Sequence, residues 1–232
     1  MDFSHINVVE KLFQYIAFLF ALSVHESAHA WMANRCGDPT ARMLGRITLN
    51  PIKHIDPIGT VLLPAIAAFA HVPVLGWAKP TPVNPSNFRN PVRDDILTSV
   101  VGPISNFVVA VGVLLVLALL SLTSRTGHYL VVNYFAFRIG IFPVPDSPLV
   151  PLVFFLNAMM QINIVLGVFN LIPVPPLDGS HVLRHFLSDS ARRAYDTIGI
   201  FGLIALVYLG GGLLSALISP PIRFFNWILT SI

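Results

Sequence analysis

The feature that most limits what this chain can fold into is an apolar run from Asp95 to Leu122, in which no charged residue follows Asp95. A run of 18 or more apolar residues predicts a helix that crosses a lipid bilayer. Further apolar runs extend over Leu149–Leu171 and 195–218. Only 11% of the residues are charged, against about 25% in soluble domains. We therefore expect an integral membrane protein.

Two shorter segments complete the expected architecture. Pro57–Ala70 is apolar but only about fourteen residues long, so we expect it to enter the membrane and return on the same side. A full crossing is the alternative. Leu44–Pro51 alternates apolar and polar residues, which is typical of a strand, and the proline-rich Gly76–Pro85 segment is expected to form an extended loop or hairpin. The expected fold class is an all-α polytopic membrane protein, a bundle of four to five membrane helices plus a re-entrant segment and a short β-hairpin.

We expect a single domain over residues 1–232. Its core covers residues 8–190 and begins with a membrane helix over Val8–Cys36, which ends before a Gly-Asp-Pro sequence. An additional span follows over 195–218, and an interfacial C-terminal helix over 221–232.

The first predicted helix carries the motif His25-Glu26-Ser27-Ala28-His29 at the end of an apolar segment. Residues four positions apart lie on one face of a helix, about 6 Å apart along its axis. Two imidazoles placed in this way bind a divalent metal, usually Zn²⁺, and Glu26 is then placed to take a proton from a metal-bound water. Ionisable groups inside an apolar segment indicate a functional site because burying them unpaired costs several kcal/mol. The alternative is a histidine pair that is hydrogen-bonded to neighbouring helices.

The distribution of basic residues predicts which side of the membrane the motif faces. Cytoplasmic loops carry an excess of Lys and Arg. If residues 57–70 re-enter, ten of the 14 basic residues lie on the side of the motif and four on the other. We therefore expect the N-terminus outside, four full spans and the motif near the cytoplasmic face. The basic residues lie in loops beside apolar segments, which favours orientation in a bilayer over nucleic-acid binding.

This topology places Asp178 at the membrane level of the histidine pair, and a catalytic zinc requires three protein ligands. Three prolines within residues 173–176 prevent a regular helix, and Gly179 permits a turn toward the interior. Irregular backbone at membrane depth is tolerated where it is buried in protein or lines a wet cavity. Asp178 is therefore the candidate third ligand. The alternative is an aspartate that caps the helical turn beginning at Ser180.

A second histidine pair, His181 and His185, has the same spacing of four residues. No glutamate follows His181, and the segment that holds both histidines is short. We therefore expect these two histidines to support Asp178 from nearby rather than to form a second metal site.

Four motifs, in this order along the chain, resemble the site-2 protease family of intramembrane zinc metalloproteases. They are His25–His29, the loop with Gly76–Pro80 and Val83–Pro85, Gly102–Asn106, and Asn170–Gly179. The resemblance implies that His25, His29 and Asp178 bind one zinc ion per chain and that Glu26 is the catalytic base. It also implies that Asn170 binds the substrate strand or its scissile carbonyl. Asn106 is a second candidate for substrate binding, with a helix-to-helix hydrogen bond as the alternative.

The expected function is that of a zinc-dependent intramembrane endopeptidase, which cleaves transmembrane segments by means of a zinc-bound water activated by Glu26. Many members of the family carry a PDZ or a CBS domain, and this chain has room for neither, which implies a minimal member. The expected partners are a transmembrane protein substrate and the lipid bilayer of a bacterial cell membrane. The Gly45–Pro51 strand could offer an edge on which an extended substrate pairs.

Two other functions stay open at this point. The chain could be a metal-ion transporter that passes ions along its His and Glu side chains. It could instead be a catalytically inactive scaffold that binds membrane helices.

Overall fold

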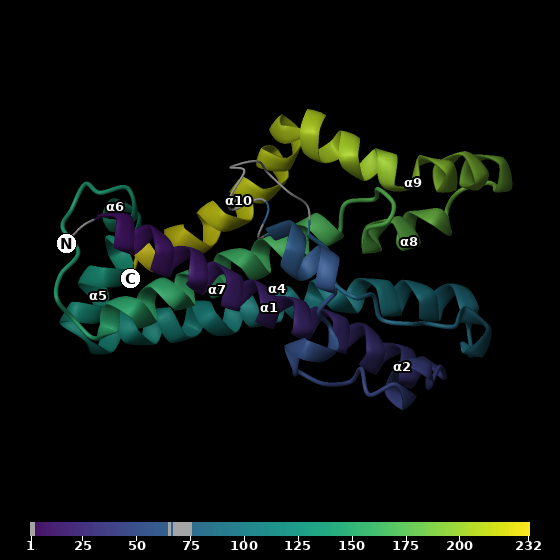
Figure 1. Ribbon diagram of the computed structural model, residues 1–232, viewed down its shortest axis with the longest axis horizontal. Helices are drawn as coiled ribbons and strands as arrows, with labels where there is room; N and C mark the ends of the chain where they lie inside the picture. The colour runs from purple at the N-terminus through teal and green to yellow at the C-terminus, as the bar shows by residue number, and fades with distance from the viewer. Residues whose placement is uncertain (1–2, 65, 67–75) are drawn as a thin grey trace. The chain divides into compact units, whose positions relative to one another are not determined.

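The computed structural model describes residues 3–64, 66 and 76–232 (Figure 1). Within these residues every regular element is a helix, which confirms the all-α class. The helices are α1 (Phe3–Cys36), α2 (Thr40–Met43), η1 (Pro51–Lys53), η2 (Pro57–Leu62), η3 (Pro85–Asn87), α4 (Pro91–Thr123), α5 (Arg125–Val132), α6 (Tyr134–Arg138), α7 (Leu149–Asn170), α8 (Asp178–Arg184), α9 (Asp189–Leu209) and α10 (Gly211–Thr230).

Three of the described helices, α4, α7 and α10, are long and apolar enough to cross a membrane. The expected number of four to five spans is therefore too high for the described part of the chain. Helix α1 is not among the three.

The C-terminal helices divide differently from the prediction. The expected span over 195–218 is interrupted, because α9 ends at Leu209 and α10 begins at Gly211. Three consecutive glycines start at Gly210, and each costs about 1 kcal/mol relative to alanine inside a helix. The apolar helix is therefore α10, and the expected interfacial helix over 221–232 forms its second half.

The predicted β-hairpin is wrong, since the described residues contain no strand. After α2, Gly45 adopts a left-handed φ of 66°. The N–H groups of Gly45 and Arg46 donate to the carbonyl oxygens of Arg42 and Ala41 at 2.9 and 3.0 Å. These groups close a turn and are not available to a strand partner. The Gly45–Pro51 segment therefore offers no strand edge to a substrate.

The predicted re-entrant segment, Pro57–Ala70, is described only in part. Its first residues form η2, and the Asp56 carboxylate caps this turn by accepting hydrogen bonds from the N–H groups of Ile58 and Gly59 at 3.0 and 2.7 Å. Residues 65 and 67–70 lie outside the described residues, and the choice between re-entry and crossing depends on them.

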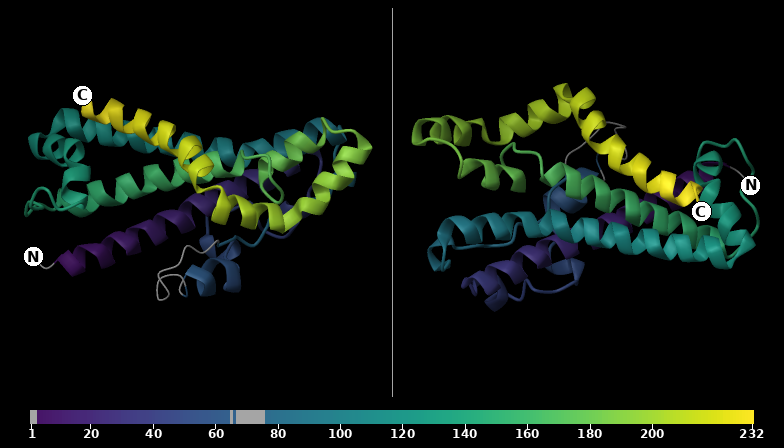
Figure 2. Two further views of the ribbon diagram at one scale, coloured as in Figure 1. Left: turned by 90° about the horizontal axis from the view of Figure 1, so that it is seen from above. Right: turned by 180° about the vertical axis from the view of Figure 1, so that it is seen from behind.

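The chain forms two compact units, the first of which comprises Met1–Phe18, Asn106–Phe169 and Leu203–Ile232. In this unit α7 lies beside the second half of α4, as Figures 1 and 2 show. Its core includes the fully buried side chains of Leu117, Leu130, Val153, Met160 and Ile164. An ion pair joins Glu10 to Arg138 at 2.7 Å.

The second unit comprises Leu19–Ser105 and Asn170–Gly202. A fully buried carboxylate, Asp38, organises the loops that follow α1. It accepts hydrogen bonds from Thr40, from the Asn84 N–H at 2.7 Å and from the Asn87 amide at 2.8 Å. Burial alone would raise the pKa of Asp38, but these hydrogen bonds hold that pKa below its ordinary value. This unit contains all four residues of the predicted zinc chemistry.

Candidate metal centre

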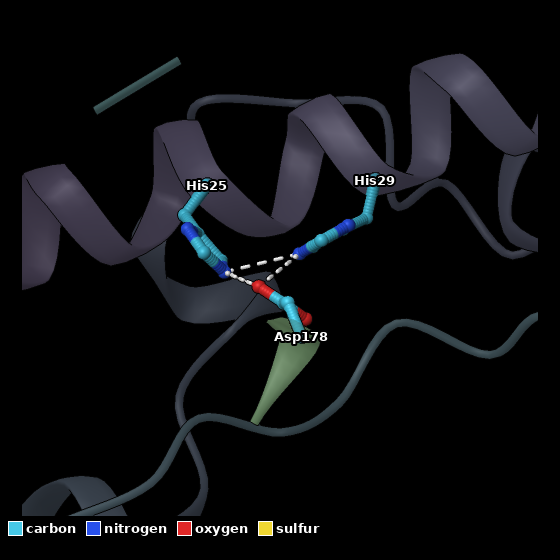
Figure 3. A group of neighbouring side chains, drawn as sticks. All are labelled: His25, His29 and Asp178. Atoms are coloured by element: carbon cyan, nitrogen blue, oxygen red, sulfur yellow. Dashed lines mark hydrogen bonds and ion pairs between the residues drawn. The ribbon is translucent and has the colours of Figure 1, made fainter. Parts of the chain in front are cut away.

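The structure brings together the side chains of His25, His29 and Asp178 (Figure 3). Both histidines are buried and point from α1 toward the carboxylate at the start of α8. The Asp178 Oδ2 atom lies 3.1 Å from Nε2 of His25 and 3.3 Å from Nε2 of His29. The two Nε2 atoms are 3.0 Å apart.

These three atoms fit a tetrahedral metal ion. Ligand atoms that bind Zn²⁺ at 2.0–2.2 Å lie roughly 3.3 Å from one another, and the three separations given above are close to that value. Asp178 Oδ2 is buried and accepts no hydrogen bond of good geometry within the described residues. One carboxylate oxygen and two imidazole nitrogens are also a donor set that zinc prefers.

The proton on His29 is fixed by a main-chain group of α4. Nδ1 of His29 lies 2.6 Å from the carbonyl oxygen of Thr98. A carbonyl only accepts, so Nδ1 must carry the proton, and Nε2 of the neutral ring presents its lone pair toward Asp178. This contact orients the ring of His29, as such hydrogen bonds do for histidines in metal sites.

Asp178 reaches the histidines because the chain cannot stay helical after α7. The prolines at 173, 175 and 176 end the helix at Asn170, as predicted from the sequence. Asp178 is the first residue of α8, and no side chain caps this helix. The alternative of a capping aspartate is therefore not what the structure contains. Gly179 permits the tight turn, because a Cβ there would lie 2.3 Å from the carbonyl oxygen of Leu171.

Gly102 in α4 provides the space that the imidazoles occupy. A Cβ at this position would lie 2.3 Å from Nε2 of His29 and 2.8 Å from Cε1 of His25. Real Cβ atoms essentially never approach so closely, so any other residue at 102 would displace the two rings. The glycine of the Gly102–Asn106 motif is therefore part of the site, a role that the sequence reasoning did not give it.

Glu26 lies beside the three-residue group and is not a member of it. It is close enough to interact electrostatically with His29. Its carboxylate is half-buried, and Oε2 accepts hydrogen bonds from the N–H and the hydroxyl of Thr81 at 2.8 and 2.7 Å. The segment 76–83, which has no regular secondary structure, therefore reaches the site through Thr81.

The second histidine pair faces a different carboxylate. Nε2 of His185 lies 2.7 Å from Oδ2 of Asp95, and Nδ1 of His181 lies 3.9 Å from Oδ1 of the same residue. The nearby Asp95 carboxylate raises the pKa of His181, and burial opposes this effect. These contacts tie α8, which begins with Asp178, to the first part of α4. They do not form a group of three metal ligands within the described residues.

The two candidate substrate-binding asparagines have different surroundings. Asn170 is the half-buried last residue of α7, immediately before the bend that leads to Asp178. Asn106 belongs to the other compact unit, where it is fully buried and donates a hydrogen bond to Oδ1 of Asn163 at 2.9 Å. This is the helix-to-helix hydrogen bond considered as its alternative. Substrate binding by either residue stays a prediction.

Comparison with known proteins adds an independent line of evidence. The model of peptidase family M50 matches residues 13–209. The chain is 34% identical over 194 residues to "Putative zinc metalloprotease YwhC" of Bacillus subtilis, a match that covers 84% of this chain and 78% of YwhC. It is 28% identical over 192 residues to "Putative zinc metalloprotease Rip2" of Mycolicibacterium smegmatis, which covers 82% of this chain and 63% of Rip2. No solved structure gives a significant match.

Proposed function

Because the chain belongs to peptidase family M50, we propose that it is a zinc-dependent endopeptidase that cleaves transmembrane segments of membrane proteins. The membership confirms the resemblance to the site-2 protease family that four sequence motifs indicated. The observation that best supports the proposal is the convergence of His25, His29 and Asp178 from two distant segments. Its three atoms match the separation that zinc requires, and Gly102 leaves space for the rings.

The residues of the site would divide the chemistry of peptide hydrolysis among them. His25, His29 and Asp178 would hold a zinc ion, which would supply a Lewis acid able to activate water and to polarise a carbonyl at neutral pH. Glu26 accepts the proton of the attacking water and passes it to the leaving amine. The Thr98 carbonyl oxygen accepts a hydrogen bond from Nδ1 of His29, so the other ring nitrogen, Nε2, is the one that would bind zinc.

We propose a transmembrane helix as the substrate and the cytoplasmic side as the location of the site. In a membrane helix the carbonyl groups are hydrogen-bonded within the helix, so the substrate must unwind before attack. Asn170 lies next to the bend that carries Asp178 and is the candidate to bind the unwound strand. The excess of basic residues in the loops near the site supports a cytoplasmic orientation. Relatives from Bacillus and Mycolicibacterium suggest a bacterial membrane.

The decisive experiment compares the purified wild type with Glu26→Gln in lipid vesicles that contain a model transmembrane peptide. We expect the substitution to lower the cleavage rate by roughly a thousandfold, because proton transfer by a placed side chain contributes about 10²–10⁴. Both proteins should contain one zinc per chain by mass spectrometry. Removal of zinc with a chelator should abolish cleavage, and added zinc should restore it.

Three other outcomes would contradict the proposal in different ways. Cleavage by Glu26→Gln at the wild-type rate would remove Glu26 from the mechanism. Zinc flux into the vesicles without cleavage would favour the metal-ion transporter. A zinc-loaded protein that neither cleaves nor transports would favour the scaffold.

A further inference from the structure

Thr81 contacts both the side chain and the main chain of Glu26. The Thr81 N–H donates to Oε2 at 2.8 Å. The Thr81 hydroxyl lies 2.7 Å from the same oxygen and 3.0 Å from the Glu26 carbonyl oxygen. Within the described residues, the other carboxylate oxygen, Oε1, accepts no hydrogen bond. One oxygen of the carboxylate is thus held, and the other is left to accept a proton.

The residues on either side of Thr81 restrict its backbone and so make its contact with Glu26 rigid. Thr81 lies between Pro80 and Pro82. Proline fixes its own φ, and a proline also restricts the residue before it to extended conformations. Neither proline has an N–H, so the Thr81 N–H is the only main-chain donor between Lys79 and Val83.

The segment that carries Thr81 is also fixed to the rest of its unit by hydrogen bonds of the residues before it, Trp77 and Lys79. The Lys79 N–H donates to the His54 carbonyl oxygen at 2.9 Å, and the Lys79 carbonyl accepts from the buried Arg46 guanidinium. The Thr60 hydroxyl donates to the Trp77 carbonyl oxygen at 2.7 Å. On the opposite side, the Asn84 N–H bonds Asp38. Thr81 is therefore positioned by contacts that do not involve Glu26.

We propose that Thr81 is a positioning residue for the reaction. It holds Glu26 by Oε2 so that Oε1 faces the attacking water. A glutamate has three side-chain torsions to fix, and small errors in the placement of a reacting group cost large factors in rate. This inference rests on the proposed function, because it assigns a role to Thr81 only if Glu26 transfers the proton.

The first test compares the steady-state kinetics of Thr81→Val, Thr81→Ser and Thr197→Val on the model transmembrane peptide in vesicles. Valine keeps the shape of threonine and removes the hydroxyl, so we expect kcat to fall about tenfold with an unchanged KM. Serine keeps the hydroxyl and should restore kcat to within about twofold. Thr197 is exposed, and its hydroxyl bonds only its own helix, at Arg193; its valine variant should behave as the wild type.

The second test measures the Glu26–Thr81 contact without the reaction. In the zinc-free protein, a double-mutant cycle of Thr81→Val and Glu26→Ala is measured by thermal unfolding. We expect each single variant to lower Tm and the double variant to lower it by no more than the larger single effect. Additive shifts would show that the two side chains are not coupled, which would overturn the inference.

The outcomes separate this inference from the proposed function. Wild-type kcat in Thr81→Val, with Glu26→Gln inactive, would overturn the role of Thr81 alone. If the wild-type protein does not cleave the peptide, or cleaves it no faster than Glu26→Gln does, both the proposed function and this inference are overturned. If Thr81→Val unfolds, Thr81→Ala replaces it. Loss of zinc in the folded alanine variant would show that Thr81 supports the metal site rather than Glu26, and would overturn the inference.

Discussion

At the scale of single residues, the candidate site depends on groups that have little chemistry of their own. Gly102 contributes the absence of a side chain, and Thr98 contributes a carbonyl oxygen. Sequence reasoning assigned roles to neither, because it searches for residues that bind or react. The motif that contains Gly102 did carry a signal, since it was one of the four that resembled the protease family. Thr98 carried none, because every residue type provides a carbonyl.

The role of Gly102 gives a prediction with an internal control in the same helix. Gly102→Ala should abolish stoichiometric zinc binding, because the new Cβ would displace both imidazoles. Gly112→Ala should keep one zinc per chain, since no atom lies within 4 Å of its added Cβ, and alanine favours the helix by about 1 kcal/mol. Zinc content by mass spectrometry and Tm by differential scanning fluorimetry would test both. A fully loaded Gly102→Ala protein would contradict the geometry described above.

At the scale of elements, α8 is a short helix with an important first residue. It spans only Asp178–Arg184, and such a helix is not stable alone. Its attachments within its compact unit include the contact of His185 with Asp95 and the Arg184–Asp196 ion pair at 3.1 Å. The first pair is largely buried and the second is exposed, so the first should contribute more to the position of α8.

We therefore predict that His185→Ala weakens zinc binding about tenfold, in the range seen when groups behind a metal ligand are removed. The cause would be a less restrained Asp178. Arg184→Ala should change zinc affinity by less than about threefold, because exposed ion pairs contribute roughly 0–1 kcal/mol. Competition with a fluorescent zinc chelator would measure both affinities. Equal effects of the two substitutions would argue against the His185–Asp95 contact as the restraint on α8.

At the scale of the whole molecule, the chain forms two compact units, and four helices contribute residues to both. These helices are α1, α4, α7, which contributes only Asn170 to the second unit, and α9. All the predicted zinc chemistry lies in one unit, whereas Asn106 and its partner Asn163 lie in the other. The described apolar helices agree with a membrane protein, and the side on which the site lies is a proposal from charge.

Sidedness can be tested because the chain has a single cysteine, Cys36. In a Cys36→Ser background, Ser190→Cys, at an exposed position, should react with an impermeant maleimide only after the cells are permeabilised. Thr126→Cys, at an exposed position on the other predicted side, should react in intact cells. The reverse pattern would place the site outside the cytoplasm.

The sequence by itself determined the features that depend on neighbouring residues. Helical periodicity placed His25 and His29 on one face, prolines ended α7, and apolar runs predicted α4 and α7. The alternation of residues 44–51 was misleading, because it reflects a loop around a buried arginine, Arg46, whose guanidinium bonds the carbonyls of Lys53 and Lys79.

Only the tertiary structure decided which distant groups meet. The approach of Asp178 to the histidines, the close passage of Gly102 and the contact of Thr81 with Glu26 all join residues far apart in the chain. Local patterns cannot specify such contacts, because they depend on the path of the whole backbone. Several of the contacts are also made by main-chain atoms, which every residue possesses, and these leave no signal in the sequence.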